Sequence, residues 1–179
     1  MNKKEQIIEV IPYDSNWLKE FKIEASRIKP LFSGNFIAIH HIGSTAVPGL
    51  SAKPTIDIIL EVCNIDLVDA CNDAMAGLGY EALGEYGIFG RRLFIKGEEK
   101  RTHHVHTFQT GNTEIHRHLC FRDYLIAHPE DAKNYAELKI RLAKEFSNNR
   151  EAYVENKHEY IKRLEQKALK WCNKQIILK

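Results

Sequence analysis

The sequence contains no run of about 20 consecutive apolar residues, which is the length that a membrane-spanning helix requires. Lys3 and Lys4 stand near the start without an apolar stretch behind them, so we expect no secretory signal peptide. Internal repeats and low-complexity tracts are also absent. The four cysteines include no Cys-x-x-Cys pair, and this usage is typical of reduced, mostly buried thiols. We therefore expect a cytoplasmic protein that does not bind a membrane and whose four thiols are reduced.

An excess of charge of one sign is missing as well. The 26 lysines and arginines nearly balance the 24 acidic residues, which leaves a formal net charge of +2. This balance argues against general DNA or RNA binding. With 44% hydrophobic and 28% charged residues, the composition is that of an ordinary globular protein. The length predicts one domain over residues 1–179 with room for a proper core.

A phosphate-binding P-loop is excluded. Gly49 follows Gly43 one position too late for the motif, and Leu50 stands where the lysine belongs. Pro54 and the β-branched residues after it favour a strand where the motif needs a helix.

Apolar periodicity and turn residues predict a mixed α/β (α+β) protein. We expect a sheet of about five strands, flanking helices, and a helical C-terminal portion over about residues 113–179. In that portion Asn112 or Thr113 caps one helix, and Pro129 begins the next. Apolar residues of that next helix form one stripe: Ala132, Tyr135, Leu138, Leu142 and Phe146. Two weaker expectations are an edge strand from Ile7 to Ile11 and a helix from Asp66 to Leu78.

The stretch from His41 to Leu60 carries the strongest functional pattern. An apolar strand over 36–42 ends at Gly43-Ser44, and a second strand over 55–62 follows a loop of small residues. Glycine lets backbone approach a ligand, and a Gly-Ser turn presents N–H groups and a hydroxyl to phosphate oxygens. Lys53 could add a point charge to the same anion. The alternative is a tight loop between two core strands.

Asp57 lies within the second strand. Strand alternation puts Asp57 on one face with Ile59 and Glu61. A carboxylate among apolar neighbours is costly unless it is paired, hydrogen-bonded or bound to a metal. Backbone donors alone could satisfy it, so a structural role is the alternative.

These residues, together with others along the chain, resemble the GrpB family within the nucleotidyltransferase-fold superfamily. The matching segments are 10–17, 41–60, 101–106, 118–125, 128–129 and 135–139. The resemblance implies a nucleotidyltransferase-like fold, and much less about activity. Relatives fused to dephospho-coenzyme A kinase point towards nucleotide or cofactor metabolism.

One departure from the superfamily pattern concerns the metal site. The pattern follows Gly-Ser with two acids separated by one residue, but Ile59 stands at the second position. A two-metal site needs several carboxylates to hold cations about 4 Å apart. Glu61 is a poorly placed substitute, so two-metal nucleotidyl transfer is in doubt.

Nine histidines are many for this length, and several cluster in the sequence. His104 and His106 share one strand face, and the resemblance implies that one of them takes the place of a later-strand acid. We predict a metal site from Asp57, His104 and His106 with His41 as a further candidate. Mg, Mn or Zn could occupy it, and imidazoles suit zinc or manganese better than magnesium. Alternatively, the histidines hydrogen-bond to Asp57 and to backbone carbonyls.

Further cations could bind phosphate or carboxylate groups. His118 and Arg122 lie four residues apart on one helix face, and Arg91 opens a strand. An arginine fork suits either anion. For Arg122, a surface salt bridge is an equally good interpretation.

Two functions from different classes remain. The first is an enzyme that transfers a nucleotidyl or phosphoryl group to a small substrate, with Asp57 and His106 as catalytic residues and Gly43, Ser44 and Lys53 on the phosphates. The second is a non-catalytic module that binds a nucleotide or another small anion and acts with a protein partner. Homo-oligomers are compatible with both.

Overall fold

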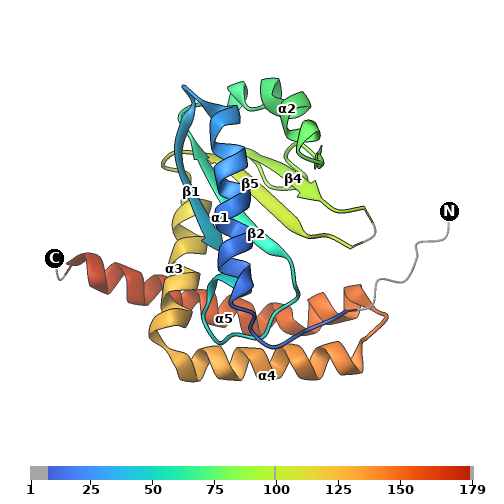
Figure 1. Cartoon of the computed structure of the whole chain (residues 1–179). Helices are drawn as coiled ribbons and strands as arrows, with labels where there is room; N and C mark the ends of the chain where they lie inside the picture. Colours follow the sequence, from blue (N-terminus) through green and yellow to red (C-terminus); the bar gives the residue numbers. More distant parts are fainter. Residues whose placement is uncertain (1–7, 99, 178–179) are drawn as a thin grey trace.

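A five-stranded mixed sheet forms the centre of the molecule (Figure 1). The computed structural model describes residues 8–98 and 100–177. The strands are β1 (Phe36–Ile42), β2 (Ile56–Val62), β3 (Tyr80–Ala82), β4 (Arg91–Lys96) and β5 (His103–Gln109). Their order in the sheet is β1-β2-β5-β4-β3, with β2 and β5 parallel and the other neighbours antiparallel. The predicted fold class is therefore confirmed.

The register of the parallel pair decides which side chains meet. Asp57 pairs with His104, and Ile59 pairs with His106. Because paired residues share a face and alternate along each strand, Asp57, His104 and His106 all project from the same side of the sheet. The opposite face presents Ile58, Leu60 and Val105 to the core.

Helices cover both faces of the sheet. Helix α1 (Asn16–Ile28) and the short α2 (Asn72–Gly77) pack on the face of Ile58, Leu60 and Val105, through Trp17, Ile28 and Met75. Helix α3 (Thr113–Ala127) packs on the other face through Ile115. As predicted, the Asn112 side chain caps α3 by accepting from the backbone N–H of Glu114.

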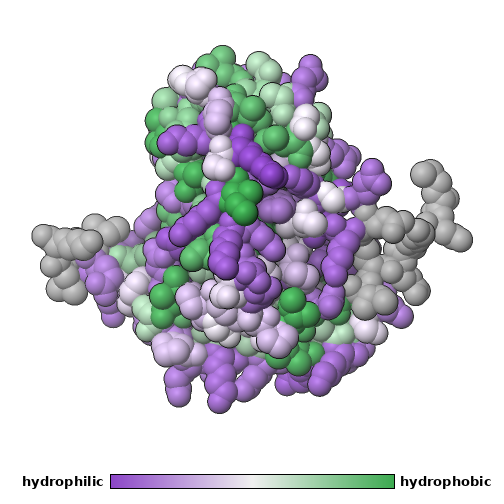
Figure 2. All heavy atoms as spheres, in the orientation of Figure 1, coloured by the Kyte–Doolittle hydropathy of each residue, from purple (hydrophilic) through white to green (hydrophobic). Residues whose placement is uncertain are grey.

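The C-terminal helices build a second core beneath the sheet. Helix α4 (Pro129–Glu145) lies below the β1–β2 loop, and helix α5 (Arg150–Ile177) crosses the molecule at the level of that loop (Figure 1). That loop packs into them, since Val47 and Leu50 share a buried cluster with Tyr135 and Leu164. Hydrophilic side chains line the outer edge of the molecule over α4, as an amphipathic helix requires (Figure 2). No helix among the described residues has the length and apolar character to cross a lipid bilayer.

Two local predictions were wrong. Residues 8–11 form no strand, and Ile11 makes only an isolated bridge to Ala52, while Ile7 lies outside the described residues. The helix predicted from Asp66 to Leu78 is broken into two 3₁₀ turns before α2 begins at Asn72. Tertiary packing overrides the local helical pattern here, because Val68 between the two turns is fully buried in the core.

The expectation of four reduced thiols is also wrong. Cys120 on α3 and Cys172 on α5 form a disulfide with a Cα–Cα distance of 5.9 Å. The two cysteines are 52 positions apart and are brought together by the packing of α3 against α5, which their spacing in the sequence does not reveal. Cys63 and Cys71 are free. The cytoplasmic location stays a prediction.

Candidate functional site

The Gly43-Ser44 turn lies directly against Asp57. Gly43 follows the end of β1 and has a φ of +72°, a conformation that residues with a Cβ rarely adopt. A Cβ at this position would lie 2.8 Å from Oδ2 of Asp57. Glycine is therefore required twice, by the backbone angle and by the close approach, and the loop is fixed beside the carboxylate.

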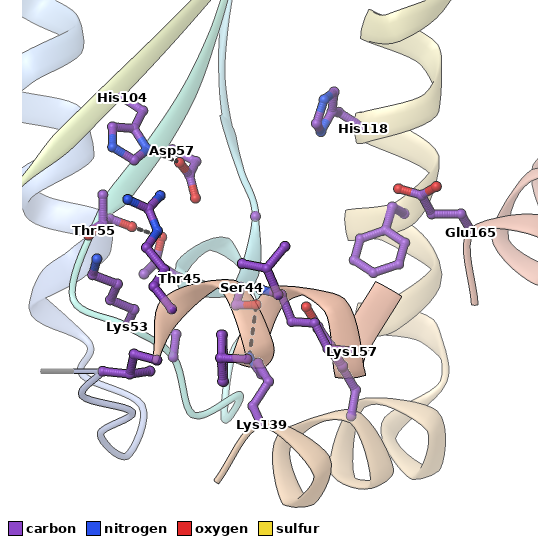
Figure 3. Close-up of a pocket in the computed structure, with 18 residues that line it drawn as sticks. Ser44, Thr45, Lys53, Thr55, Asp57, His104, His118, Lys139, Lys157 and Glu165 are labelled. Atoms are coloured by element: carbon purple, nitrogen blue, oxygen red, sulfur yellow. Dashed lines mark hydrogen bonds and ion pairs between the residues drawn. The ribbon is translucent and has the colours of Figure 1, made fainter. Parts of the chain in front are cut away.

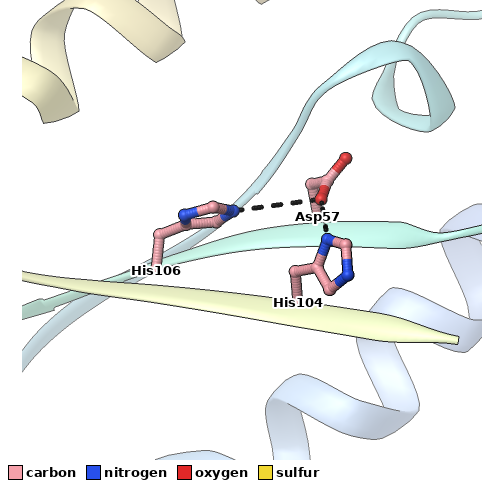
Figure 4. Close-up of side chains that lie close together, drawn as sticks. All are labelled: Asp57, His104 and His106. Atoms are coloured by element: carbon pink, nitrogen blue, oxygen red, sulfur yellow. Dashed lines mark hydrogen bonds and ion pairs between the residues drawn. The ribbon is translucent and has the colours of Figure 1, made fainter. Parts of the chain in front are cut away.

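Asp57, His104 and His106 form a cluster, hereafter the Asp–His cluster (Figure 4). Oδ1 of Asp57 lies 3.0 Å from Nδ1 of His104 and 3.9 Å from Nε2 of His106. One oxygen or nitrogen from each residue lies within 4.8 Å of the others. A carboxylate and two imidazoles at such separations can hold one transition-metal ion with small side-chain movements.

Asp57 is ionised at neutral pH. Its burial favours the neutral acid and acts to raise the pKa. The hydrogen bond from His104 and charge interactions with His104 and His106 outweigh this effect and hold the pKa well below its ordinary value. The cluster therefore presents a carboxylate that is already negative and is stabilised by two imidazoles.

Arg91 decides which nitrogen of His106 carries the proton. Nη1 of Arg91 lies 3.4 Å from Nδ1 of His106. A guanidinium can only donate, so Nδ1 of His106 is an acceptor and Nε2, facing Asp57, is protonated. Similarly, Nδ1–H of His104 donates to Asp57. Asp57 thus accepts one hydrogen bond from His104 and faces the N–H of His106 at 3.9 Å, and metal binding must displace both protons.

A cavity of about 330 Å³ opens beside the cluster (Figure 3). It lies between the β1–β2 loop and helices α3, α4 and α5, and its volume is that of a small-molecule site. Asp57 and His104 stand at one end, whereas Lys139 and Lys157 lie towards the other. Six of the residues predicted from the sequence line it: Gly43, Ser44, Lys53, Asp57, His104 and His118.

His118 does not contribute a positive charge to this cavity. Burial is the main cause that lowers its pKa to about 4, and the charges of Arg117 and His106 act in the same direction. Its ring centroid lies 5.9 Å from that of His106. His118 is therefore a neutral imidazole at neutral pH.

Four other predicted residues are not part of the cavity lining: His106, which belongs to the Asp–His cluster, and His41, Arg91 and Arg122. His41 pairs with Ile58 on β2, so it projects from the face opposite Asp57, where it stacks on Phe21. Its Nε2 pairs with the Thr45 hydroxyl at 3.0 Å. Burial is the main cause that lowers its pKa to about 4.

Both arginines are engaged elsewhere. Arg122 lies on α3 four residues after His118, but it donates to the backbone carbonyl of His41 and pairs with Asp123. Arg91 donates to the carbonyls of Glu85 and Tyr86 in addition to its contact with His106.

The second acid of the superfamily pattern has no substitute here. Ile59 is fully buried with Ile42, Phe108 and Ile115. Glu61, the other candidate, accepts a hydrogen bond from Thr110 and lies 3.7 Å from His40. Neither position offers a carboxylate to the Asp–His cluster.

Sequence reasoning missed the basic residues of the C-terminal helices. Lys139, Arg150 and Lys157 line the cavity, together with Tyr135 and Tyr153. Lys139 is the most informative, since it is 3% exposed. Its position within the apolar stripe of α4, between Tyr135 and Leu142, was a signal that could have found it.

Comparison with known proteins gives a consistent result. The family model described as GrpB protein matches residues 7–167. The UPF0157 protein YqkA of Bacillus subtilis is 48% identical over 92% of this chain, which spans only about half of that protein (48%). A crystal structure of conserved protein GrpB from Enterococcus faecalis matches with a TM-score of 0.88 and 43% identity, over 90% of this chain and 98% of that one.

A more distant similarity involves a named enzyme. The dephospho-CoA kinase of Mycolicibacterium paratuberculosis is 22% identical over 93% of this chain, which covers 47% of that enzyme. The extent of the family match, and the identity to relatives covered over most of this chain, leave no ambiguity about membership. The chain belongs to the GrpB family.

Proposed function

We propose that the Asp–His cluster binds a single divalent metal ion. In the adjoining cavity, the protein would transfer a phosphoryl or nucleotidyl group to or from a small anionic substrate. The observation that carries the proposal is the convergence of Asp57, His104 and His106 beside a cavity lined by Gly43, Ser44 and basic side chains. Such a site needs metal-coordinating atoms close together, here within 4.8 Å of one another, and beside them a cavity large enough for a small molecule.

The donor set fits one metal and favours particular ions. Two imidazoles and a carboxylate suit zinc, manganese or iron better than magnesium. The apolar side chain at Ile59 leaves no carboxylate for a second cation. When bound, such an ion supplies positive charge that stabilises the developing charge on a phosphoryl group.

Residues of the loop and the cavity would bind and position the substrate. Gly43 gives a ligand close access to the backbone beside Asp57, and the Ser44 hydroxyl faces the same cavity. Lys53 lines the same cavity, and partial burial lowers the pKa of its amine. Catalysis in this arrangement is electrostatic positioning of the transferred group.

A second function is favoured by a specific observation. Asp57 already accepts from His104, and Arg91 directs the His106 proton towards Asp57, so the cluster is satisfied without a metal. In this alternative the chain binds a nucleotide or another small anion without turnover and acts with a protein partner.

The test is the thermal midpoint of metal-stripped protein with Zn²⁺, Mn²⁺ or Mg²⁺, alone and with nucleoside triphosphates. A ligand that binds only the native state stabilises it by mass action, by about 2.7 kcal/mol at 100 times its Kd. We expect a shift with Zn²⁺ or Mn²⁺ and a larger one when a nucleotide is added. A shift from nucleotide alone that no cation alters would support the binding module and contradict the transferase.

Replacing Arg91 with glutamine is expected to tighten metal binding about tenfold. A histidine that ligates a metal through Nε2 carries its proton on Nδ1 and needs an acceptor there, which Arg91 cannot provide. The glutamine carbonyl can accept that proton. Competition with a chromophoric chelator measures the affinity, with Arg92→Gln as the matched control because Arg92 pairs with Asp69 outside the site. Unchanged or weaker binding in Arg91→Gln would show that His106 is not a ligand.

A further inference from the structure

Lys139 carries a buried amine that no opposite charge among the described residues contacts. Its amine donates to the Ser44 hydroxyl at 2.9 Å and to the Ser51 carbonyl at 2.6 Å, and it lies 4.5 Å from the centre of the Tyr135 ring. All of these partners are neutral. Within residues 8–98 and 100–177, no carboxylate lies within 4.0 Å of this amine. A buried charge without an opposite charge is costly, and proteins rarely retain one without a use.

The same end of the cavity holds a second such amine. Lys157 on α5 lies 4.7 Å from the centre of the Tyr153 ring, and no carboxylate of the described residues reaches it either. Lys53 and Arg150 add positive charge to the same lining. Of the two acids that line the cavity, Asp57 is engaged by histidines and Glu165 by Arg117. The cavity therefore has an excess of positive charge at the end away from the Asp–His cluster.

We propose that Lys139 and Lys157 form an anion subsite, contributed by α4 and α5, that binds the phosphate end of a phosphorylated ligand. Lysines are compact point charges that suit the several oxygens of a phosphate or diphosphate group. The Ser44 hydroxyl links this subsite to the Gly43-Ser44 loop, so one ligand can contact the loop and both helices. The inference rests on the proposed function only in placing its substrate in the same cavity; the subsite itself requires no metal.

The surroundings of Lys139 also predict the direction of a pH effect. Burial first, and then the charge of Lys157, lower the Lys139 pKa to about 7. The groups that face it are Lys157 on α5, Tyr135 on its own helix and, across the cavity, Asp57 with His104. An anion bound at the amine raises this pKa. The contribution of Lys139 to affinity is therefore complete below about pH 7 and is lost as pH rises through the higher pKa of the bound state.

The experiment is calorimetric titration of the full chain with inorganic pyrophosphate in the presence of EDTA. We expect the wild type to bind, and both Lys139→Met and Lys157→Met to bind at least tenfold more weakly. Lys133→Met is the matched control, because Lys133 lies on the exposed face of α4, where it pairs with Glu137. The difference between the wild type and Lys139→Met should shrink between pH 6 and pH 9.

Two results would overturn the inference. One is wild-type protein that does not bind pyrophosphate, and the other is wild-type affinity in both Lys157→Met and a folded Lys139→Met. If Lys139→Met does not fold, the affinity of Lys157→Met decides the test. Lys157 is only half-buried, so we expect its replacement to leave the fold intact. EDTA separates the two proposals, since pyrophosphate binding without metal tests the anion subsite alone, whereas the thermal shift with Zn²⁺ or Mn²⁺ tests the Asp–His cluster.

Discussion

Replacing Asp57 with asparagine is expected to weaken zinc or manganese binding at least 100-fold, the largest effect on binding that we predict. Asp57 is the one charged ligand of the Asp–His cluster, and its oxygen lies within reach of both histidines. The amide that replaces it keeps the shape and removes the negative charge. The measurement is competition with a chromophoric chelator on metal-stripped protein, followed by metal analysis after desalting.

Asp73→Asn is the matched control, because it removes an exposed carboxylate from α2. If Asp57→Asn and Asp73→Asn bind metal equally well, the cluster is not the metal site.

Asp57→Asn is also expected to change how the stability of the fold depends on pH. The Asp57 pKa is lowered in the native state by its histidine partners, so the carboxylate stabilises the fold above the unfolded-state pKa of about 4. This contribution is lost as pH falls through the native pKa. The gap in unfolding free energy between the wild type and Asp57→Asn should therefore be present at pH 7 and close in acid. Urea denaturation at several pH values measures it.

Loss of the Cys120–Cys172 disulfide is expected to cause the largest change in stability. The bond closes a segment of 52 residues that contains the end of α3, all of α4 and most of α5. In the chain-entropy model a loop of this length corresponds to about 4 kcal/mol, and measured values for native disulfides fall at about 2–5 kcal/mol. Urea denaturation of Cys172→Ser and of oxidised wild type, at matched pH, gives the difference.

Cys63→Ser is the control, since Cys63 is exposed and unbonded. Thiol titration of the unfolded, unreduced protein should count two free thiols, matching Cys63 and Cys71. Four free thiols, or equal stability of Cys172→Ser and Cys63→Ser, would contradict the disulfide.

The Asp–His cluster illustrates what the sequence can predict. Alternation along each strand places His104 and His106 on one face, and Asp57 on one face of its own strand. Whether those two faces coincide depends on the register between β2 and β5, which no local pattern reveals. The parallel pairing of Asp57 with His104 supplies that information.

His41 and Lys139 show where prediction failed in opposite ways. His41 is adjacent to the Gly-Ser turn in sequence, but antiparallel pairing makes Ile42 the neighbour of Asp57 and turns His41 to the other face. Lys139 is 95 positions from Ser44, so only the packing of α4 beneath the loop brings them together. Helix periodicity did predict that the stripe of α4 is buried, and a lysine inside such a stripe is a signal in its own right.

The parallel pairing of β2 and β5 also sets when the Asp–His cluster comes into existence. Asp57 and His104 are 47 positions apart, with β3 and β4 in the chain between them, so β5 must close a long segment to pair with β2. Contacts between distant segments form late, because the entropy of closing the intervening chain is lost first. If the proposed metal ion binds this cluster, it finds no complete site in the early stages of folding. It cannot template the fold, and its stabilisation should appear almost entirely as slower unfolding.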